Sequence, residues 1–405
     1  QRAFTEKATD DDLKRMVHEV KASIRAGAIG FSTTRSVNHQ TSDDKPVASR
    51  IASWEEMSAL VHAMGELNAG ILEIAGEPTG ASGERAIRYY NALKQLAIES
   101  GRPITFGMFG TRVAPGAWRP CFEIVEQAAE EGGRMFVQVH SRELNVLLSF
   151  ETHTPFDKWD IWRDIRKLPL DAQKAKLRDP EIRRRLVEVA SRPYEGPEVR
   201  GTEARPPEWD WVYLFDSPHG PHRSMADLAR ERNMHPVDLF IDLALERDLK
   251  LFLRQPIANE DQDDALEMMR HPRSVVTFSD AGAHVSQIMD NSLQTHLLAH
   301  WVREKQAFTL EEAVRCITYD TATQWGFHDR GLLREGMAAD INVFDPKTIG
   351  ARMPEVVTDL PAGAKRLRQT AEGMLATVVN GEIVLERNRP TGALPGRLLR
   401  GKVPN

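Results

Sequence analysis

The chain has few cysteines, few aromatic residues and no long apolar run, and each shortage excludes a class of protein. The 2 cysteines among its 405 residues, Cys121 and Cys316, are too far apart in sequence to suggest a disulfide framework or a paired zinc motif. No stretch is long and apolar enough to suggest a membrane span or a signal peptide. A net charge of −6 gives no general attraction to nucleic acid. We therefore expect a cytoplasmic protein without a membrane or nucleic-acid partner.

The chain instead shows the pattern of a large α/β enzyme. Apolar strands alternate with stretches of helical periodicity, and the spacing suits crossover helices better than hairpins. The strands are predicted at 28–33, 71–75, 104–109, 135–140 and 275–280. This order predicts a parallel (β/α)8 barrel, of which five strands lie in this chain.

Asp280 stands at the end of the last predicted strand, in Val275–Asp280. In such barrels the carboxyl ends of the strands form the active site, so a carboxylate there can bind a metal or move a proton from an attacking water to a leaving nitrogen. The alternative is a strand-end Asp that caps the turn at Gly282. The segments described next favour the first interpretation.

Several segments carry a family resemblance. They are Val275–His284, Asp329–Asp345, Ala26–Thr33, Glu311–Arg315 and Thr377–Glu382. Together they resemble the amidohydrolase superfamily, most strongly its N-acyl-D-amino-acid deacylase branch, also called the D-aminoacylase-like branch. The resemblance implies a TIM-like barrel with strands four to eight in this chain and a small C-terminal β-sandwich part.

The same resemblance implies a domain organisation. Residues 1–340 would form the C-terminal five strands of the barrel, with 141–273 inserted between its last two strands as a helical lid that contacts other subunits. Residues 341–405 would form part of the β-sandwich and a C-terminal tail. The earlier barrel strands and half of the sandwich would then lie upstream of Gln1, which leads us to expect an upstream fragment as a partner and an insoluble or inactive chain without it.

The metal ligands are the weakest part of the resemblance. In the deacylase branch, the fifth and sixth barrel strands end in histidines that bind zinc, whereas the corresponding segments here, 73–76 and 107–110, contain none. The expectation is therefore one zinc ion held by Asp280 and by ligands from a His-x-His strand upstream of Gln1. A chain that binds no metal is an alternative.

Four further residues are candidates for substrate binding. His140 and Arg142 follow the 135–140 strand, His284 follows Asp280, and Arg35 follows the first strand. All four would then lie near the barrel mouth, where they could orient a carbonyl or a carboxylate. For each, the alternative is a role in fixing the loop in which it lies.

The sequence thus predicts a metal-dependent amidohydrolase that cleaves a non-peptide C–N bond, with Asp280 as catalytic residue and metal ligand. The substrate would be a small amide such as an N-acyl (D-)amino acid, and the enzyme a homo-oligomer. Two alternatives remain at this stage: a hydantoinase- or dihydropyrimidinase-like hydrolase of cyclic amides, and a non-catalytic barrel subunit that has lost its metal ligands.

Overall fold

A computed structural model of the chain describes residues 2–43, 45–77, 79, 82–196, 199, 205–282 and 284–403. Its centre is a five-stranded parallel sheet with strand order β1-β2-β3-β4-β8. The strands are β1 (Gly30–Thr34), β2 (Ile71–Ala75), β3 (Ile104–Gly107), β4 (Met135–Val139) and β8 (Ser274–Val276). The prediction of an α/β fold with a parallel sheet is confirmed, although β8 ends sooner than its apolar run suggested.

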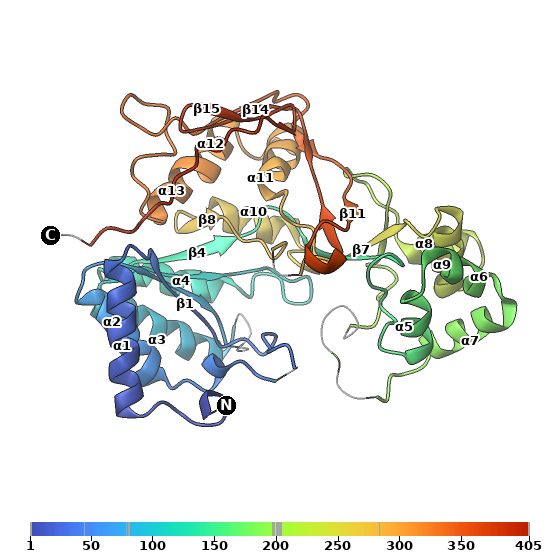
Figure 1. Ribbon diagram of the computed structural model, residues 1–405, viewed down its shortest axis with the longest axis horizontal. Helices are drawn as coiled ribbons and strands as arrows, with labels where there is room; N and C mark the ends of the chain where they lie inside the picture. The colour runs from blue at the N-terminus through green and yellow to red at the C-terminus, as the bar shows by residue number, and fades with distance from the viewer. Residues whose placement is uncertain are drawn as a thin grey trace.

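Helices connect these strands, and α1 to α4 lie side by side along one side of the sheet (Figure 1). They are α1 (Asp10–Arg25), α2 (Trp54–Gly65), α3 (Glu84–Ser100) and α4 (Arg119–Glu130), with α10 (Gln262–Arg270) before β8. Thr9 and Ser53 begin α1 and α2 by accepting hydrogen bonds from backbone N–H groups of the first turn. Such caps satisfy donors that a helix start otherwise leaves unpaired.

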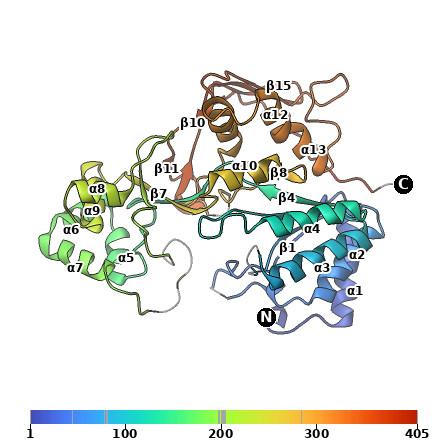
Figure 2. The ribbon, with the colours of Figure 1, turned by 180° about the vertical axis from the view of Figure 1, so that it is seen from behind.

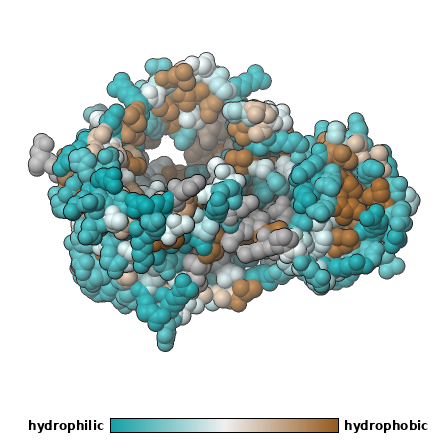
Figure 3. Space-filling view, turned by 60° about the horizontal axis from the view of Figure 1, so that its bottom comes forward, coloured by the Kyte–Doolittle hydropathy of each residue, from teal (hydrophilic) through white to brown (hydrophobic). Residues whose placement is uncertain are grey.

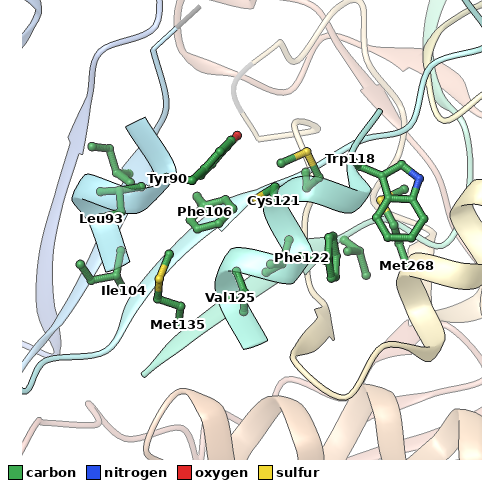
Figure 4. Close-up of a cluster of buried hydrophobic side chains, with 14 of the residues drawn as sticks. Tyr90, Leu93, Ile104, Phe106, Trp118, Cys121, Phe122, Val125, Met135 and Met268 are labelled. Carbon is green, nitrogen blue, oxygen red and sulfur yellow. The ribbon is translucent and has the colours of Figure 1, made fainter. Parts of the chain in front are cut away.

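The helices and the sheet enclose the main hydrophobic core. Alternate strand residues face the helices, so Ile104 and Phe106 of β3 lie beside Met135 of β4 and meet Leu93 and Val125 from the helices (Figure 4). Each fully buried side chain of this size contributes about 1.5–3 kcal/mol relative to an exposed one. This core fixes the strands whose ends carry the candidate site residues.

The insertion between β4 and β8 forms a separate lobe with its own core, which stands at one end of the molecule (Figure 1). Its helices are α5 (Asp160–Arg166), α6 (Leu170–Arg178), α7 (Pro180–Ala190), α8 (Met225–Glu231) and α9 (Pro236–Glu246). They pack beside an antiparallel sheet of order β5-β7-β6, formed by β5 (Leu144–Leu148), β7 (Phe252–Ala258) and β6 (Tyr213–Phe215). Sequence periodicity indicates the helices and β7 but not β5, because that strand follows β4 almost directly and has no polar alternation.

The C-terminal part begins with a helical region and continues as small antiparallel sheets. The helical region contains α11 (Leu293–His296), the π-helical η4 (Leu297–Glu304), α12 (Leu310–Arg315), the π-helical η5 (Cys316–Asp320) and α13 (Thr321–Gln324). The largest of these sheets has order β16-β15-β14-β9, from β16 (Arg389–Pro390), β15 (Glu382–Glu386), β14 (Met374–Val379) and β9 (Ile341–Phe344). Asn380 and Gly381, both at positive φ, form the hairpin turn between β14 and β15, as is typical of an Asn-Gly pair.

Short elements complete the chain. Two strand pairs join β10 (Gly350–Ala351) to β13 (Ala371–Glu372) and β11 (Glu355–Val357) to β12 (Arg366–Arg368). Three 3₁₀ turns are η1 (Arg2–Phe4), η2 (Ala48–Arg50) and η6 (Pro361–Gly363). Among the described residues, no helix combines the length and the apolar character needed to cross a bilayer.

Candidate active site at the strand ends

Asp280 lies in the loop that follows β8, at the carboxyl edge of the parallel sheet. Its side chain is partly buried. Burial raises the pKa of Asp280 above its ordinary value, and the negative charge of Asp290 adds to this effect, while His284, His39 and His140 oppose it. A carboxylate with a raised pKa binds a proton more readily than one in water, as a general base requires.

Asp290 holds the loop that carries Asp280. Its carboxylate accepts hydrogen bonds from the Ser279 hydroxyl at 2.7 Å and from the Asp280 backbone N–H at 2.9 Å. Burial alone would raise the pKa of Asp290, but its contact with His140 and these hydrogen bonds hold that pKa below its ordinary value. Asp290 is therefore an ionised anchor, and sequence reasoning missed it because a lone Asp beyond a strand-end loop has no motif of its own.

His140 reaches the same anchor from β4. Its Nε2 lies 3.3 Å from the Asp290 Oδ2, and both side chains are fully buried. The Nδ1 atom accepts the backbone N–H of Arg142 at 3.1 Å, which assigns the ring proton of a neutral imidazole to Nε2. That proton faces Asp290 without being aligned for a full hydrogen bond. Among the described contacts, His140 supports the anchor and does not touch Asp280 directly.

The other predicted residues lie in different places. His284 is exposed, its backbone N–H donates to the Asp280 carbonyl at 3.2 Å, and its ring is close enough to affect the pKa of Asp280. Arg35 pairs with Glu77 at 2.7 Å and donates to the Ala52 carbonyl at 2.7 Å, so it ties loops together. Arg142 donates to the Ser292 hydroxyl at 2.6 Å and lines a different cavity. Asp280 and His140 thus contact Asp290, and His284 lies near Asp280, while Arg35 is tied to Glu77 and Arg142 lines another cavity.

The face of the sheet opposite the α1–α4 layer is polar. Ser32, Glu73 and Thr105 follow one another across β1, β2 and β3, and Gln138 donates to Glu73 at 2.9 Å. The Thr277 hydroxyl donates to Gln138 at 3.4 Å, which extends these contacts to β8. Period-two alternation places these side chains on one face, and hydrogen bonds join Glu73, Gln138 and Thr277 there, a contact that the sequence alone did not reveal.

This polar face borders a large open cleft. The cleft has a volume of about 1290 Å³, and its walls include Ser32, Thr34, Glu73, Gly107 and Phe278. Phe278 packs edge-to-face on Phe109, with ring centroids 4.6 Å apart. Figure 3 shows the molecule hollowed between its N-terminal and C-terminal parts. The cleft has room for a small substrate beside the strand ends.

The described residues do not complete a metal site. Within the ranges given above, no group of three or more His, Cys, Asp or Glu side chains is placed to hold a metal ion. A catalytic zinc site usually has three protein ligands. Asp280 could supply one of them, since its carboxylate is partly desolvated in the loop after β8, but the described residues provide no complete ligand set around it.

Comparison with known protein families gives a match in the C-terminal part of the chain. Residues 221–385, which include Asp280, match the amidohydrolase family. Among curated proteins, the chain is similar to the N-acyl-D-aspartate deacylase of Alcaligenes xylosoxydans xylosoxydans, with 32% identity over 143 residues, 34% of this chain and 26% of that protein. It is also similar to the N-acyl-D-glutamate deacylase of the same organism, with 37% identity over 106 residues, 26% of this chain and 20% of that protein. The aligned region therefore spans only about a quarter of these relatives.

Solved structures with the same fold cover nearly the whole chain. A D-aminoacylase superposes with a TM-score of 0.58 at 18% identity, over 98% of this chain and 68% of its own. The N-acyl-D-glutamate deacylase of Bordetella bronchiseptica, solved with zinc and a phosphonate inhibitor, superposes with a TM-score of 0.59 at 19% identity. The superposition covers 99% of this chain and 68% of that one. A D-aminoacylase is also described with a binuclear metal centre. These matches confirm the predicted resemblance: residues 221–385 match the amidohydrolase family, and the aligned segments are similar to deacylases of the D-aminoacylase-like branch.

Proposed function

We propose that this chain contributes strands four to eight of an amidohydrolase (β/α)8 barrel, and that its site hydrolyses a non-peptide C–N bond. One observation carries the proposal. At the carboxyl end of β8, last in a row of five parallel strands, Asp280 is partly buried, has a raised pKa and sits on a loop anchored by Asp290. A proton shuttle for amide hydrolysis needs a carboxylate at a strand end of the barrel with a pKa raised enough to bind a proton readily.

The chemistry of the step follows from these residues. The ionised Asp280 takes a proton from the water that attacks the amide carbonyl carbon, and then returns it to the leaving nitrogen as the C–N bond breaks. The hydrogen bond from its backbone N–H to Asp290 fixes the loop during both transfers. His140 packs against Asp290 from β4 and so fixes the anchor itself. His284 is proposed to contact the substrate from the exposed side of Asp280.

The substrate class comes from the relatives. Curated proteins similar to this chain are named as deacylases of N-acyl-D-aspartate and N-acyl-D-glutamate. We propose an N-acyl D-amino acid or a related small amide as the substrate. A single zinc ion, bound by Asp280 with ligands from a fragment upstream of Gln1, is part of the proposal, as is a role of Arg35 in substrate binding. Because the described ligand set is incomplete, no chemical step is assigned to the metal.

The domain boundaries also belong to the proposal. Residues 1–340 would be the barrel part, the inserted lobe 141–273 would cover the site and carry subunit contacts, and 341–405 would be part of the β-sandwich. The lobe's independent core supports its treatment as a unit, since it can move or pack without disturbing the main core.

A substrate panel tests the proposed activity. We expect the chain, supplied with zinc and co-expressed with an upstream fragment that carries a His-x-His strand, to release amino acid from N-acetyl-D-aspartate and N-acetyl-D-glutamate. Release is measured by chromatography, and the L-enantiomers serve as matched controls. Hydrolysis of hydantoin or dihydrouracil in preference to these acyclic amides would contradict the deacylase assignment and favour the cyclic-amide alternative.

A further inference from the structure

A second cavity, separate from the cleft, is lined by basic side chains. It has a volume of about 210 Å³, and Arg142, Arg254, His222, His296 and His300 all contribute to its wall. None of the residues that line it is Asp280, Asp290 or His140, and it shares no lining residue with the larger cleft. It is smaller than a typical pocket for a drug-sized ligand and suits a small molecule or ion.

Arg142 is a cation of this cavity that has no ion pair among the described residues, although Glu143 and Asp290 are near enough to affect its pKa. Among the described residues, its side chain makes one hydrogen bond, to the Ser292 hydroxyl, and no carboxylate lies within ion-pair distance. Burial, and next the positive charge of Arg254, lower the pKa of Arg142. A guanidinium has five N–H donors in a planar fork, so four remain for a ligand. A buried charge without a counter-ion is costly to fold, and an anion would relieve that cost.

The two carboxylates in the wall are already engaged. Glu143 pairs with Arg254, which also lies over the ring of Tyr213 at 5.1 Å from its centroid. Glu304 lies 3.0 Å from the Nδ1 of His300. Neither carboxylate has an ion-pair contact with Arg142. With both carboxylates engaged, the wall retains the guanidinium of Arg142 as a charged donor, beside Gln369, whose buried Oε1 has no partner among the described residues.

Several buried polar atoms around the cavity have no hydrogen-bond partner among the described residues. Among the described residues, His296 Nε2, His300 Nε2 and Arg254 Nε are buried without a hydrogen bond. Buried polar atoms are nearly always satisfied in folded proteins, so a cluster of unsatisfied ones around a cavity points to a missing ligand. Burial and neighbouring Arg254 lower the pKa of His222 to about 4, and burial together with Arg142 lowers the pKa of His296. Burial is the largest cause of both shifts, and the positive charges of Arg254 and Arg142, which a bound anion would offset, add to it.

The walls come from three parts of the chain. Arg142 follows β4, His222 and Arg254 belong to the inserted lobe, and His296 and His300 lie on α11 and η4. In both ribbon views β7 of the lobe and β11 of the C-terminal part lie side by side near this region (Figure 1, Figure 2). An occupant of the cavity would therefore join the lobe to the C-terminal part.

From this geometry we propose that the cavity is a binding site for a small oxyanion, held by the guanidinium fork of Arg142 and by His296. The ligand is a carboxylate or phosphate group, since both match a planar guanidinium with two parallel hydrogen bonds. It binds outside the proposed reaction site and strengthens the contact between the lobe and the C-terminal part.

Thermal unfolding with inorganic phosphate and with succinate tests this proposal. The unfolding temperature is measured at increasing concentrations of each anion, and sodium chloride at equal ionic strength is the control. No substrate is present, so the outcome does not depend on the proposed activity. Wild-type protein should gain thermal stability in a saturable way, because a ligand that binds only the folded state stabilises it. The anion with the lower Kd identifies the ligand as a phosphate or a carboxylate.

Variants make the test specific. Arg142→Met should weaken binding of the preferred anion at least about tenfold, as loss of a charge-assisted hydrogen bond does. His296→Leu provides a second variant if the first does not fold, and the exposed Arg88→Met is the matched control that should bind as wild type does. Equal stabilisation of wild type and both cavity variants, or no saturable stabilisation of wild type, would overturn the proposal.

Discussion

Replacing Asp280 by Asn is expected to lower kcat/KM for amide hydrolysis by about 10³-fold, the scale of a lost general acid–base group. The amide of Asn has nearly the same shape as the carboxylate, but it cannot take a proton from water or return one to the leaving nitrogen. The backbone N–H of residue 280 would still donate to Asp290, so the loop should keep its position. The rates are measured with the N-acyl D-amino acid that the substrate panel identifies.

The control for this prediction is Asp263→Asn. Asp263 is an exposed acid in the first turn of α10, so its replacement changes the net charge equally without touching the site. Circular dichroism and thermal unfolding should show both variants folded. A D280N protein that is folded and retains wild-type kcat/KM would remove Asp280 from the mechanism.

Replacing Asp290 by Ala is expected to destabilise the folded chain by about 3 kcal/mol, measured by chemical denaturation. The change leaves the Ser279 hydroxyl and the Asp280 backbone N–H without their acceptor, and it removes the carboxylate that faces the buried His140 ring. Asp164→Ala removes an exposed carboxylate in α5 and should change the free energy of unfolding by no more than about 0.5 kcal/mol. A similar decrease in the free energy of unfolding in the two variants would show that Asp290 does not anchor the loop.

The stability that Asp290 provides should depend on pH in a defined direction. Its pKa is lower in the folded chain than in the unfolded chain, where the ordinary value is about 3.9. The contribution of Asp290 to the free energy of unfolding is therefore complete above the unfolded-state pKa. It is lost as pH falls through the lower pKa of the folded state. The effect of Asp280 on stability has the opposite pH dependence. Because its pKa is raised in the folded chain, its contribution to the free energy of unfolding falls as pH rises through that folded-state pKa. The Asp290→Asn variant should lack the loss at low pH that wild type shows.

The sequence predicts the main sheet well because local pattern and burial agree there. The strands predicted at 71–75 and 135–140 are β2 and β4 in the structure, the second of them one residue shorter than predicted. The small sheet of the lobe is different: β5 is buried throughout and so has no alternation to reveal it. Tertiary packing, which the local sequence does not encode, decided its conformation.

The candidate site is predictable in part for similar reasons. Asp280 was identified because it ends a strand, and strand ends meet at one edge of a parallel sheet. Asp290 and the partners of Arg142 could not be identified, because their contacts depend on loop paths and on distances between segments far apart in sequence. Arg35 follows a strand in the same way as Asp280 does, yet its side chain turns to Glu77, which strand position alone does not specify.

The central claim is that Asp280 belongs to a metal-dependent amide-hydrolysing site, and zinc removal and re-addition test it most directly. The protein, prepared with its upstream fragment, is treated with a chelator, and amino-acid release from the preferred N-acyl D-amino acid is measured alongside the bound zinc. We predict that activity is lost with the metal and returns as one zinc ion per chain is restored in wild type, while Asp280→Asn neither regains activity nor retains that ion. Full activity in a protein shown to contain no metal, or equal recovery in the D280N variant, would contradict the account.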